Sequence, residues 1–464
     1  MATSFLHGFE FIETAIYHPI EMVRSSVIGL VGTAPKGPIN SPTLITRRVD
    51  AVANFGDLED GYTIPHALKA IFDQGDFIGF VVVVNVFDPS VHKSSVSGVS
   101  KTFEADNKLK LDHRWVMNEV VTSEDGLTTY VRGTDYSIDY VSGVITRLTG
   151  GAIPSGATVR VSYDYQDPAL VVSGDIIGGV DAQGNKKGIE ALLDVSSIYG
   201  FAPKILIAPV FSKEKQVMDA LLTKADTLRA VAIADPQEGW TVEQVIQYRG
   251  QFDSPRAIIC YPNVYYYDPI QGVEKLGPLS PYLAGVMSRT DNTLGWWYSP
   301  SNKVIYGVTK LERPIPYISF SSPNSLANYL NENHIVTVIN FEGFRVWGNR
   351  SATTDSAWKF IAVRREFDMI EDSVEIGTLH LLDRPINRAF FEDLTDSVQA
   401  FLNSLVGRGA IIAGKVKVLP EDNPPEQIAN GHVTARIDIT PTYPAERITY
   451  NVTLSIEELR QLFQ

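Results

Sequence analysis

The sequence predicts a multi-domain α/β protein: an α/β core, an antiparallel β-domain inserted into that core, and a C-terminal α+β domain, with extended arms at both termini. Apolar strand runs alternate with amphipathic helices in residues 21–92 and again in 171–365, which indicates the core. Short alternating runs divided by glycines fill residues 93–170, and residues 366–464 carry two amphipathic helices followed by strands. Residues 1–20 form the N-terminal arm.

Length and composition limit the classes of protein to which the chain can belong. Its 464 residues have room for about two to four domains that each bury a core. The net charge of −14 argues against nucleic-acid binding, which needs a basic face, and fits a soluble protein with a basic partner. The single cysteine, Cys260, excludes an intrachain disulfide and a cysteine-based zinc site.

No segment predicts a secretion signal or membrane insertion. The N-terminus lacks the basic region and the long apolar run of a signal peptide. The most apolar run, residues 77–87, is 11 residues long, about half of the roughly 20 that a membrane helix needs. We interpret it as a buried strand and expect the protein to be cytosolic where it is made.

The core pattern is a strand, a helix and a second strand with nearly unbroken Val/Ile runs. Such runs are typical of a parallel sheet that is covered on both faces. In the first part of the core we expect strands at residues 27–35 and 80–87 and a helix, opened by Pro65, at 65–74. After the insertion we expect strands at residues 204–209, 230–234 and 257–260 and helices at 212–229 and 241–252.

The inserted domain is predicted from a change of period. Short alternating runs at roughly 8–12-residue spacing indicate a small antiparallel domain. The runs are residues 128–131, 137–140, 144–148 and 158–165. We expect this domain on the outside of the core, because both of its ends must lie at one loop of the core.

Two acid-rich helices open the C-terminal domain, and we expect part of the negative charge on their exposed faces. The first has an apolar face formed by Phe367, Ile370, Val374 and Leu381. The acids around the rest of this helix are Asp368, Glu371, Asp372 and Glu375. The second, residues 387–406, has a buried stripe of Phe391, Leu394, Val398, Phe401, Leu402 and Leu405. Its opposite side carries Glu392, Asp396, Gln399 and Asn403.

Three strands follow these helices, at residues 414–419, 433–439 and 448–454. The last two alternate cleanly between apolar and polar residues, which is typical of strands with one buried face. The apolar members are Val433, Ala435, Ile437, Ile439, Ile448, Tyr450, Val452 and Leu454.

A search for catalytic or ligand-binding motifs finds none, so we predict no enzyme, no cofactor and no metal. The string GAIIAGK at residues 409–415 has the spacing of a phosphate loop, but it follows a helix, and its glycines are better explained as a helix end. The eight histidines never lie three to five residues apart, and no Gly-x-Ser-x-Gly elbow occurs. Spacing alone leaves open a triad that is assembled across the fold.

The N-terminal arm is rich in apolar residues and has no helical period. These residues are Phe5, Leu6, Phe9, Phe11, Ile12, Ile16 and Tyr17. One interpretation is an edge strand of the chain's own sheet. The other is a strand added to the sheet edge of another subunit, which builds rings or helices. The C-terminal strands and the tail offer the same possibility.

Several strings resemble the contractile tail sheath family, in its P2-phage and R-type pyocin branch. They are FLHGFEFIE and SSVIGLVGTAP near the N-terminus, SPSNK at residues 299–303, GFRVWGNRS at 343–351, and GRGAII after the late helix. The resemblance covers nearly the whole chain apart from the insertion, which is similar to the extra outer domain of longer phage sheaths. The presence of this insertion favours a phage tail over a pyocin.

The resemblance implies a structural protein with a subtilisin-like core that stacks with copies of itself around a tail tube. It implies that the N-terminal arm and a C-terminal arm near residues 448–459 complete sheets in neighbouring C-terminal domains, whose receiving strands lie within 414–454. It further implies contacts with tube, baseplate and tail terminator proteins, assembly in the bacterial cytoplasm and a place in the virion tail.

The late helix is similar to the tube-attachment helix of that family. Glu392, Asp393 and Asp396 would form an acidic patch facing a basic tube, although acids at a helix start are also favoured by the helix dipole. We expect Trp347 to pack in the core and Arg350 to make a fixed salt bridge. The alternatives are a sheath of an R-type bacteriocin or extracellular injection system and, more distantly, a hydrolase on an α/β scaffold.

Overall fold

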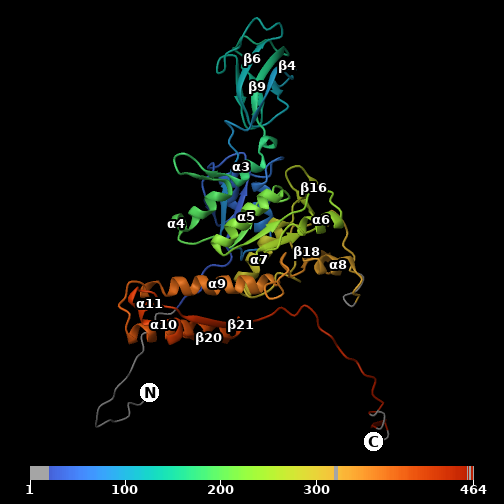
Figure 1. Cartoon of the computed structure of the whole chain (residues 1–464). Helices are drawn as coiled ribbons and strands as arrows, with labels where there is room; N and C mark the ends of the chain where they lie inside the picture. The colour runs from blue at the N-terminus through green and yellow to red at the C-terminus, as the bar shows by residue number, and fades with distance from the viewer. Residues whose placement is uncertain (1–19, 318–321, 457, 459–460, 463–464) are drawn as a thin grey trace, which may run out of the picture. The chain divides into compact units, whose positions relative to one another are not determined.

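The computed structural model describes residues 20–317, 322–456, 458, 461 and 462, which fall into two compact units (Figure 1). One unit ends at Leu382 and the other begins at Asp383. The larger unit contains the α/β core and the inserted β-domain, and the smaller unit contains the last helices and strands. No helix in these described ranges is both long enough and apolar enough to cross a bilayer.

The core of the larger unit is an eight-stranded mixed sheet with the order β19-β18-β14-β13-β12-β1-β3-β2. Its strands are β1 (Ile28–Gly32), β2 (Thr43–Ile45), β3 (Val81–Asn85), β12 (Ile205–Ile207), β13 (Val231–Ala234), β14 (Ala257–Cys260), β18 (Ile335–Asn340) and β19 (Phe344–Trp347). The strands from β18 to β3 are parallel, whereas β19 and β2 run antiparallel to their neighbours. The prediction of a parallel sheet is thus wrong for the two edge strands. A tight turn returns β19 beside β18, and β2 is too short to show a strand periodicity in the sequence.

Helices cover both faces of this sheet. Alternate residues of a strand point to opposite faces, so Leu30 and Val31 enter two different apolar clusters. One cluster is completed by α1 (Arg48–Phe55), α2 (Ile64–Phe72) and α7 (Ser280–Thr293). The other is completed by α5 (Lys215–Leu228), α6 (Val242–Arg249) and α8 (Leu326–Glu332). The predicted core strands and the helices α2, α5 and α6 are confirmed, most of them with shorter bounds, and α1, α7 and α8 were not predicted.

A long helix, α9 (Ile361–Gly377), is tied to the amino ends of the parallel strands by ion pairs. Lys204 Nζ, directly before β12, pairs with Asp372. Arg256, directly before β14, donates two hydrogen bonds to Asp368, of 2.5 and 2.8 Å. β12 and β14 lie two strand spacings apart, about 10 Å, whereas Asp368 and Asp372 are separated by a helical rise of about 6 Å. The long lysine and arginine side chains span the difference.

This arrangement corrects two predictions about α9. Asp368 and Asp372 were expected on the exposed side, but the side chain of Asp368 is 1% exposed and that of Asp372 is 13% exposed, because both face buried bases. Leu381 lies beyond the helix, in the 3-10 turn η3 (Leu379–Leu381). The compact units divide after Leu382, and the predicted 365/366 domain boundary, which falls inside α9, stays a prediction.

The inserted domain consists of two three-stranded antiparallel sheets around an apolar cluster of their own (Figure 1). The sheets are β4 (Lys93–Thr102), β9 (Thr158–Gln166) and β6 (Val116–Ser123), and β5 (Lys108–Lys110), β8 (Val144–Arg147) and β7 (Tyr136–Asp139). The runs at 137–140, 144–148 and 158–165 are confirmed as strands. The run at 128–131 is wrong: a turn at Gly126 leaves it with a single bridge, from Thr129 to Thr122. The two ends of the domain meet where Asp167 N donates to His92 O at 3.0 Å.

The remaining elements are short, apart from those of the smaller unit. In the larger unit they are η1 (Pro168–Leu170), α3 (Ser173–Ile177), β10 (Gly179–Val180), β11 (Lys186–Lys187), η2 (Gly188–Asp194), α4 (Val195–Tyr199), β15 (Val264–Asp268), β16 (Val273–Gly277) and β17 (Lys310–Leu311). The smaller unit contains α10 (Arg388–Gly407), β20 (Ile411–Lys417), η4 (Pro420–Asp422), α11 (Pro425–Ala429) and β21 (Arg436–Pro441).

Candidate assembly interface

The smaller unit is built on α10, which begins and ends as its sequence predicts. The side chain of Asn387 caps the helix by accepting a hydrogen bond from Phe390 N at 2.9 Å. At the other end Gly409 has φ +72°, and Ala410 N donates to Leu405 O, so the glycine is a helix end rather than part of a phosphate loop. The predicted stripe is buried from Val398 onward, whereas Phe391 and Leu394 are half-buried.

A two-stranded hairpin packs against this helix. β20 and β21 pair antiparallel, with Val416 opposite Ile437 and Gly414 opposite Ile439. A Cβ atom on Gly414 would lie 3.0 Å from Leu402 Cβ, so β20 can approach α10 this closely because residue 414 is glycine. Two strands alone are marginally stable, and strand edges present unpaired backbone groups. The hairpin is therefore suited to receive further strands.

The third predicted strand, residues 448–454, is wrong as a strand of this chain. Within the described residues it is an extended segment that pairs with no strand, and β21 is paired with β20 alone (Figure 1). Its four alternating apolar side chains are 66 to 93% exposed: Ile448, Tyr450, Val452 and Leu454. Tyr443 and Ile456 on either side are also exposed. A segment with strand periodicity and uncovered apolar side chains is suited to pair with another molecule.

The three acids predicted to face a tube are exposed on the first half of α10. Glu392 pairs with Arg388 at 2.8 Å and Asp393 with Arg384 at 2.8 Å, through exposed side chains. Asp396 lies with Glu392 at the rim of an apolar groove of about 780 Å³ that also includes Phe391. Such exposed pairs are worth about 0–1 kcal/mol each and can be exchanged for others. The patch is therefore partly balanced by its own arginines, which the sequence prediction did not include.

The predicted residues of the N-terminal arm lie outside the described residues. They are Phe5, Leu6, Phe9, Phe11, Ile12 and Ile16. Their role as a donated strand stays a prediction.

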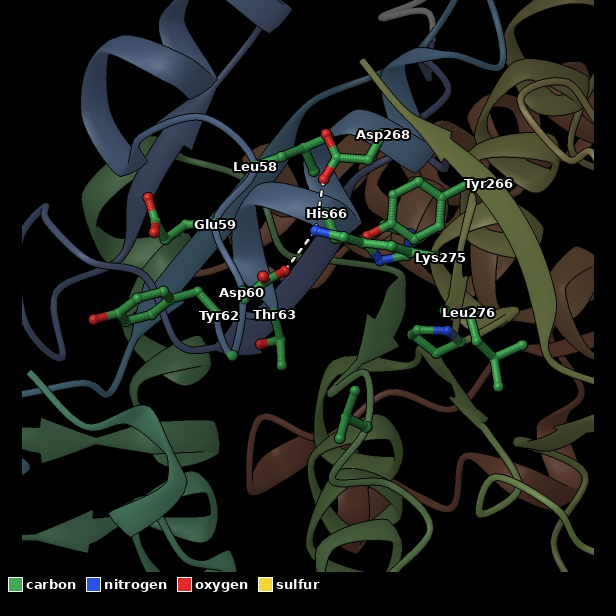
Figure 2. Close-up of a pocket in the computed structure, with 14 residues that line it drawn as sticks. Leu58, Glu59, Asp60, Tyr62, Thr63, His66, Tyr266, Asp268, Lys275 and Leu276 are labelled. Atoms are coloured by element: carbon green, nitrogen blue, oxygen red, sulfur yellow. Dashed lines mark hydrogen bonds and ion pairs between the residues drawn. The ribbon is translucent and has the colours of Figure 1, made fainter. Parts of the chain in front are cut away.

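A pocket at the carboxyl edge of the main sheet is where an enzyme of this fold class would bind its substrate. It has a volume of about 270 Å³, and its lining includes His66 of α2, Val210 after β12, and the β15–β16 hairpin (Figure 2). Figure 2 shows Lys275 Nζ held between Asp60 and Asp268, at 2.5 and 2.7 Å. Burial lowers the pKa of His66 to about 3, and its ring packs on Tyr266. Both carboxylates are thus tied to the one lysine, and the histidine is a packed neutral ring rather than a base.

Three family models match the chain. They are the phage tail sheath protein central domain at residues 184–352, the phage tail sheath C-terminal domain at 353–455, and the tail sheath protein Gp18 domain III N-terminal region at 25–86. The tail sheath protein of Burkholderia phage BcepMu is 41% identical over 477 residues, covering 100% of this chain and 99% of its own length. The chain belongs to the phage tail sheath family. The matched ranges leave between them residues 87–183, which contain the inserted domain.

Other similar proteins extend this result. A putative prophage major tail sheath protein of Pseudomonas aeruginosa strain UCBPP-PA14 is 35% identical, over 66% of this chain and 78% of its own length. The tail sheath fold is also found in the helical sheath of the anti-feeding prophage in its contracted state, with a TM-score of 0.60 and 18% identity. The match covers 98% of this chain and 100% of that one. The PVC sheath complex of an extracellular contractile injection system, also contracted, has a TM-score of 0.59 and 16% identity, and the match covers 98% of this chain and 100% of that one. The chain therefore belongs to a family of structural proteins and not to the hydrolases.

The two sheath-like strings at residues 299–303 and 343–351 lie side by side in the core. Gly348 N donates to Ser301 Oγ at 3.0 Å, and Val346 N donates to Lys303 O at 3.0 Å. The half-buried Trp347 packs against one of the two core clusters, as predicted. These contacts give both strings a structural role in this tail sheath protein. The salt bridge of Arg350 stays a prediction.

The sequence did not reveal two features of the smaller unit. Gln399 was placed on the exposed side of α10, but its amide bonds the backbone of β20. Phe390 is buried although it lies one position before the predicted stripe. Helical periodicity reports the average direction of a side chain, and it carries no signal for a neighbouring strand that is packed close enough to be reached.

Proposed function

We propose that the chain is the subunit of a contractile phage tail sheath, which polymerises helically around the tail tube and contracts to drive the tube through the host envelope. Its full-length identity of 41% to a phage tail sheath protein carries this proposal. The fold shared with two sheaths solved in contracted states supports it. The sheath would be assembled in the bacterial cytoplasm and become part of the virion tail. Its core would be subtilisin-like, as in the family.

Assembly would occur by strand exchange at both ends of the chain. The exposed alternating segment at residues 448–454 is the donated C-terminal strand, and residues 5–17 are the N-terminal one. The sheet of β20 and β21 receives strands from neighbouring copies, since an open strand edge carries backbone groups able to pair. Strands donated to a non-equivalent surface make heterologous contacts, which build rings and helices.

The tail tube protein would bind the acidic patch of Glu392, Asp393 and Asp396 through a basic surface. Baseplate and tail terminator proteins would contact the two ends of the sheath, and a chain of similar fold is present in the anti-feeding prophage baseplate, with a TM-score of 0.60. Contraction would then move each subunit largely as a rigid body, with the exchanged strands as hinges. Exposed ion pairs of about 0–1 kcal/mol are weak enough to break one ring at a time.

Electron microscopy of the purified full chain tests this function. We expect long hollow cylinders from the wild type. Deletion of residues 1–20, or substitution of Ile448, Tyr450, Val452 and Leu454 by serine, should leave folded protein that does not polymerise. The matched control is Leu127→Ser with Val131→Ser, which changes exposed apolar side chains of the inserted domain and should polymerise normally. Normal cylinders from both arm variants would contradict strand exchange.

The second candidate is a sheath of an R-type bacteriocin or of an extracellular injection system. The fold similarity to the PVC sheath favours it, whereas the phage relatives and the inserted domain favour a phage. Capsid genes beside the gene for this chain would decide for a phage, and their absence next to tube and baseplate genes would decide for the alternative.

A further inference from the structure

We propose that Gln399 closes the outer edge of β20 and so directs the exchanged strand of a second copy to the outer edge of β21. This inference rests on the strand exchange proposed above and adds to it the receiving edge and the residue that selects it. Its basis is a contact between a side chain of α10 and the backbone of β20.

The amide of Gln399 makes the two hydrogen bonds that a neighbouring strand would make. Gln399 Nε2 donates to Gly414 O at 3.0 Å, and Val416 N donates to Gln399 Oε1 at 3.1 Å. In a parallel ladder, one residue of the adjacent strand donates to the carbonyl before its partner and accepts from the amide after it. Gln399 bonds the residues on either side of Lys415 in this way. The side chain therefore occupies the place of a strand residue.

Two further contacts hold the amide in this place. Gly414 lets β20 lie close to α10, so a helix side chain can reach the edge of the strand. Asn403, one turn along α10, accepts a hydrogen bond from Gln399 Nε2 at 3.0 Å through its Oδ1. A strand arriving at β20 would have to displace an amide whose oxygen and nitrogen are both already bonded.

The register of the hairpin leaves the edge of β21 open. Because Val416 N–H points to Gln399, it points away from β21, and opposite residues of an antiparallel ladder point outward together. The backbone groups of Ile437 and Ile439, opposite Val416 and Gly414, therefore point away from β20. Among the described residues, β21 has β20 as its sole partner. This edge can accept a strand without displacing a side chain.

The occupant we assign is the segment of residues 448–454 from a second copy. Its apolar side chains alternate, and so do those of β21, where Ile437 and Ile439 are half-buried on the face of the sheet that carries Val416. A third strand would extend this apolar face, with its own Thr and Asn residues on the opposite face. The seven residue-to-residue steps from Pro441 to Ile448 can span about 23 Å, enough to leave the donor's own hairpin.

Disulfide trapping in assembled full-length sheath tests the choice of edge. Asp438 of β21 and Lys415 of β20 are exposed cross-strand partners, so they are matched sites for cysteine. Each is combined in turn with Thr449→Cys, Asn451→Cys or Thr453→Cys, which covers the alternative registers. A disulfide needs Cα atoms about 4.4–6.8 Å apart, a distance that an adjacent strand meets and the next one does not. The native Cys260 is buried and does not compete.

We expect cross-linked dimer in the Asp438→Cys series at about ten times the yield of the Lys415→Cys series. Gln399→Met, which keeps the side-chain length but removes the amide, should raise the yield of the Lys415→Cys series several-fold. Equal cross-linking yields from the Lys415→Cys and Asp438→Cys series, in protein that retains Gln399, would overturn the inference. This result does not depend on whether the methionine variant folds.

A deletion of residues 446–464 separates this inference from the proposed strand exchange. If the deletion stops polymerisation and neither cysteine series cross-links, the exchange stands and the β21 edge is the wrong assignment. If the deletion polymerises normally, the C-terminal exchange itself is wrong and the inference fails with it.

Discussion

The helices α9 and α10 follow each other in the chain, and both carry several acids, yet the acids are used in different ways. On α9, Asp368 and Asp372 are bonded to arginines and a lysine at the amino ends of the core strands. Asp368 is bonded to both Arg256 and Arg364, and Arg229 is bonded to Asp372 and Glu375. The acids of α10 are exposed and pair with arginines of their own segment.

The difference shows that charge density alone does not identify a binding surface. A buried ion pair is a fixed part of the fold, because removing one partner leaves an uncompensated charge without water. An exposed pair can be replaced by a pair with another molecule at little cost. Of these two helices, α10 therefore carries the acids whose ion pairs are most easily exchanged for pairs with another molecule. On α9, Asp368 and Asp372 are committed to the fold.

The largest expected effect is the loss of a buried acid of α9. Asp368→Asn removes the buried carboxylate that Arg256 and Arg364 share and should lower the free energy of unfolding of the larger unit by about 3–5 kcal/mol. Urea unfolding followed by tryptophan fluorescence measures it. The matched control is Asp393→Asn on α10, which should change stability by less than about 0.5 kcal/mol. Equal effects of the two variants would remove the distinction between the helices.

The next effect concerns a buried acid without a basic partner. Asp235, after β13, accepts hydrogen bonds from Ser280 N at 2.6 Å and from the Ser280 hydroxyl, and burial raises the pKa of its carboxyl to about 6. The folded protein then keeps this proton up to about pH 6, whereas the unfolded chain loses it near pH 4. The contribution of Asp235 to stability therefore falls as the pH rises from about 4 to 6, by about 3 kcal/mol in total.

Unfolding midpoints of wild type and Asp235→Asn between pH 4 and 7 measure this pH-dependent contribution of Asp235 to stability. The stability of the variant relative to the wild type should rise with pH across that window, because the amide does not titrate. A constant difference would mean that Asp235 is as ionised in the folded protein as in the unfolded chain. In that case burial without a basic partner would cost this acid nothing, and the contrast with the paired acids of α9 would weaken.

A smaller effect tests whether α10 is held by apolar packing instead of charge. Gly414→Ala would place a methyl group 3.0 Å from Leu402 Cβ and 2.9 Å from Ile411 Cδ1, so β20 must move away from α10. We expect a loss of about 1–3 kcal/mol from the smaller unit. Gly407→Ala at the end of α10 meets no atom within 4 Å and serves as the control. Stability unchanged by Gly414→Ala would show that the close approach is not needed.

Much of the fold could be predicted from local patterns. Strand runs such as residues 80–87, the helix start at Asn387 and the end at Gly409 depend on periodicity and capping, which are encoded within a few residues. The strand β4 was missed because most of its residues are Ser, Lys and Thr, and β6 was missed because a register shift between Met117 and Val120 interrupts its alternation. The edge strands β2 and β19 were missed because pairing direction depends on the path of the chain.

The candidate interface could be predicted in part, for a similar reason. The alternation at residues 448–454 indicates a strand, but no local signal reports that its partner lies outside the chain. Asp368 on α9 and Glu392 on α10 have similar local sequence surroundings, and what separates them is whether a distant arginine meets the helix. The partner of Asp368, Arg256, lies 112 positions earlier in the chain.

Electron microscopy of a charge-reversal variant tests the central claim most directly. The variant carries Glu392→Lys, Asp393→Lys and Asp396→Lys and is produced together with the tail tube protein. We predict an unfolding curve within about 0.5 kcal/mol of the wild type. We also predict sheaths that polymerise in the contracted form with no tube inside. Extended tails with a normal tube would contradict the claim that the exposed acids of α10, unlike the buried acids of α9, bind the tube.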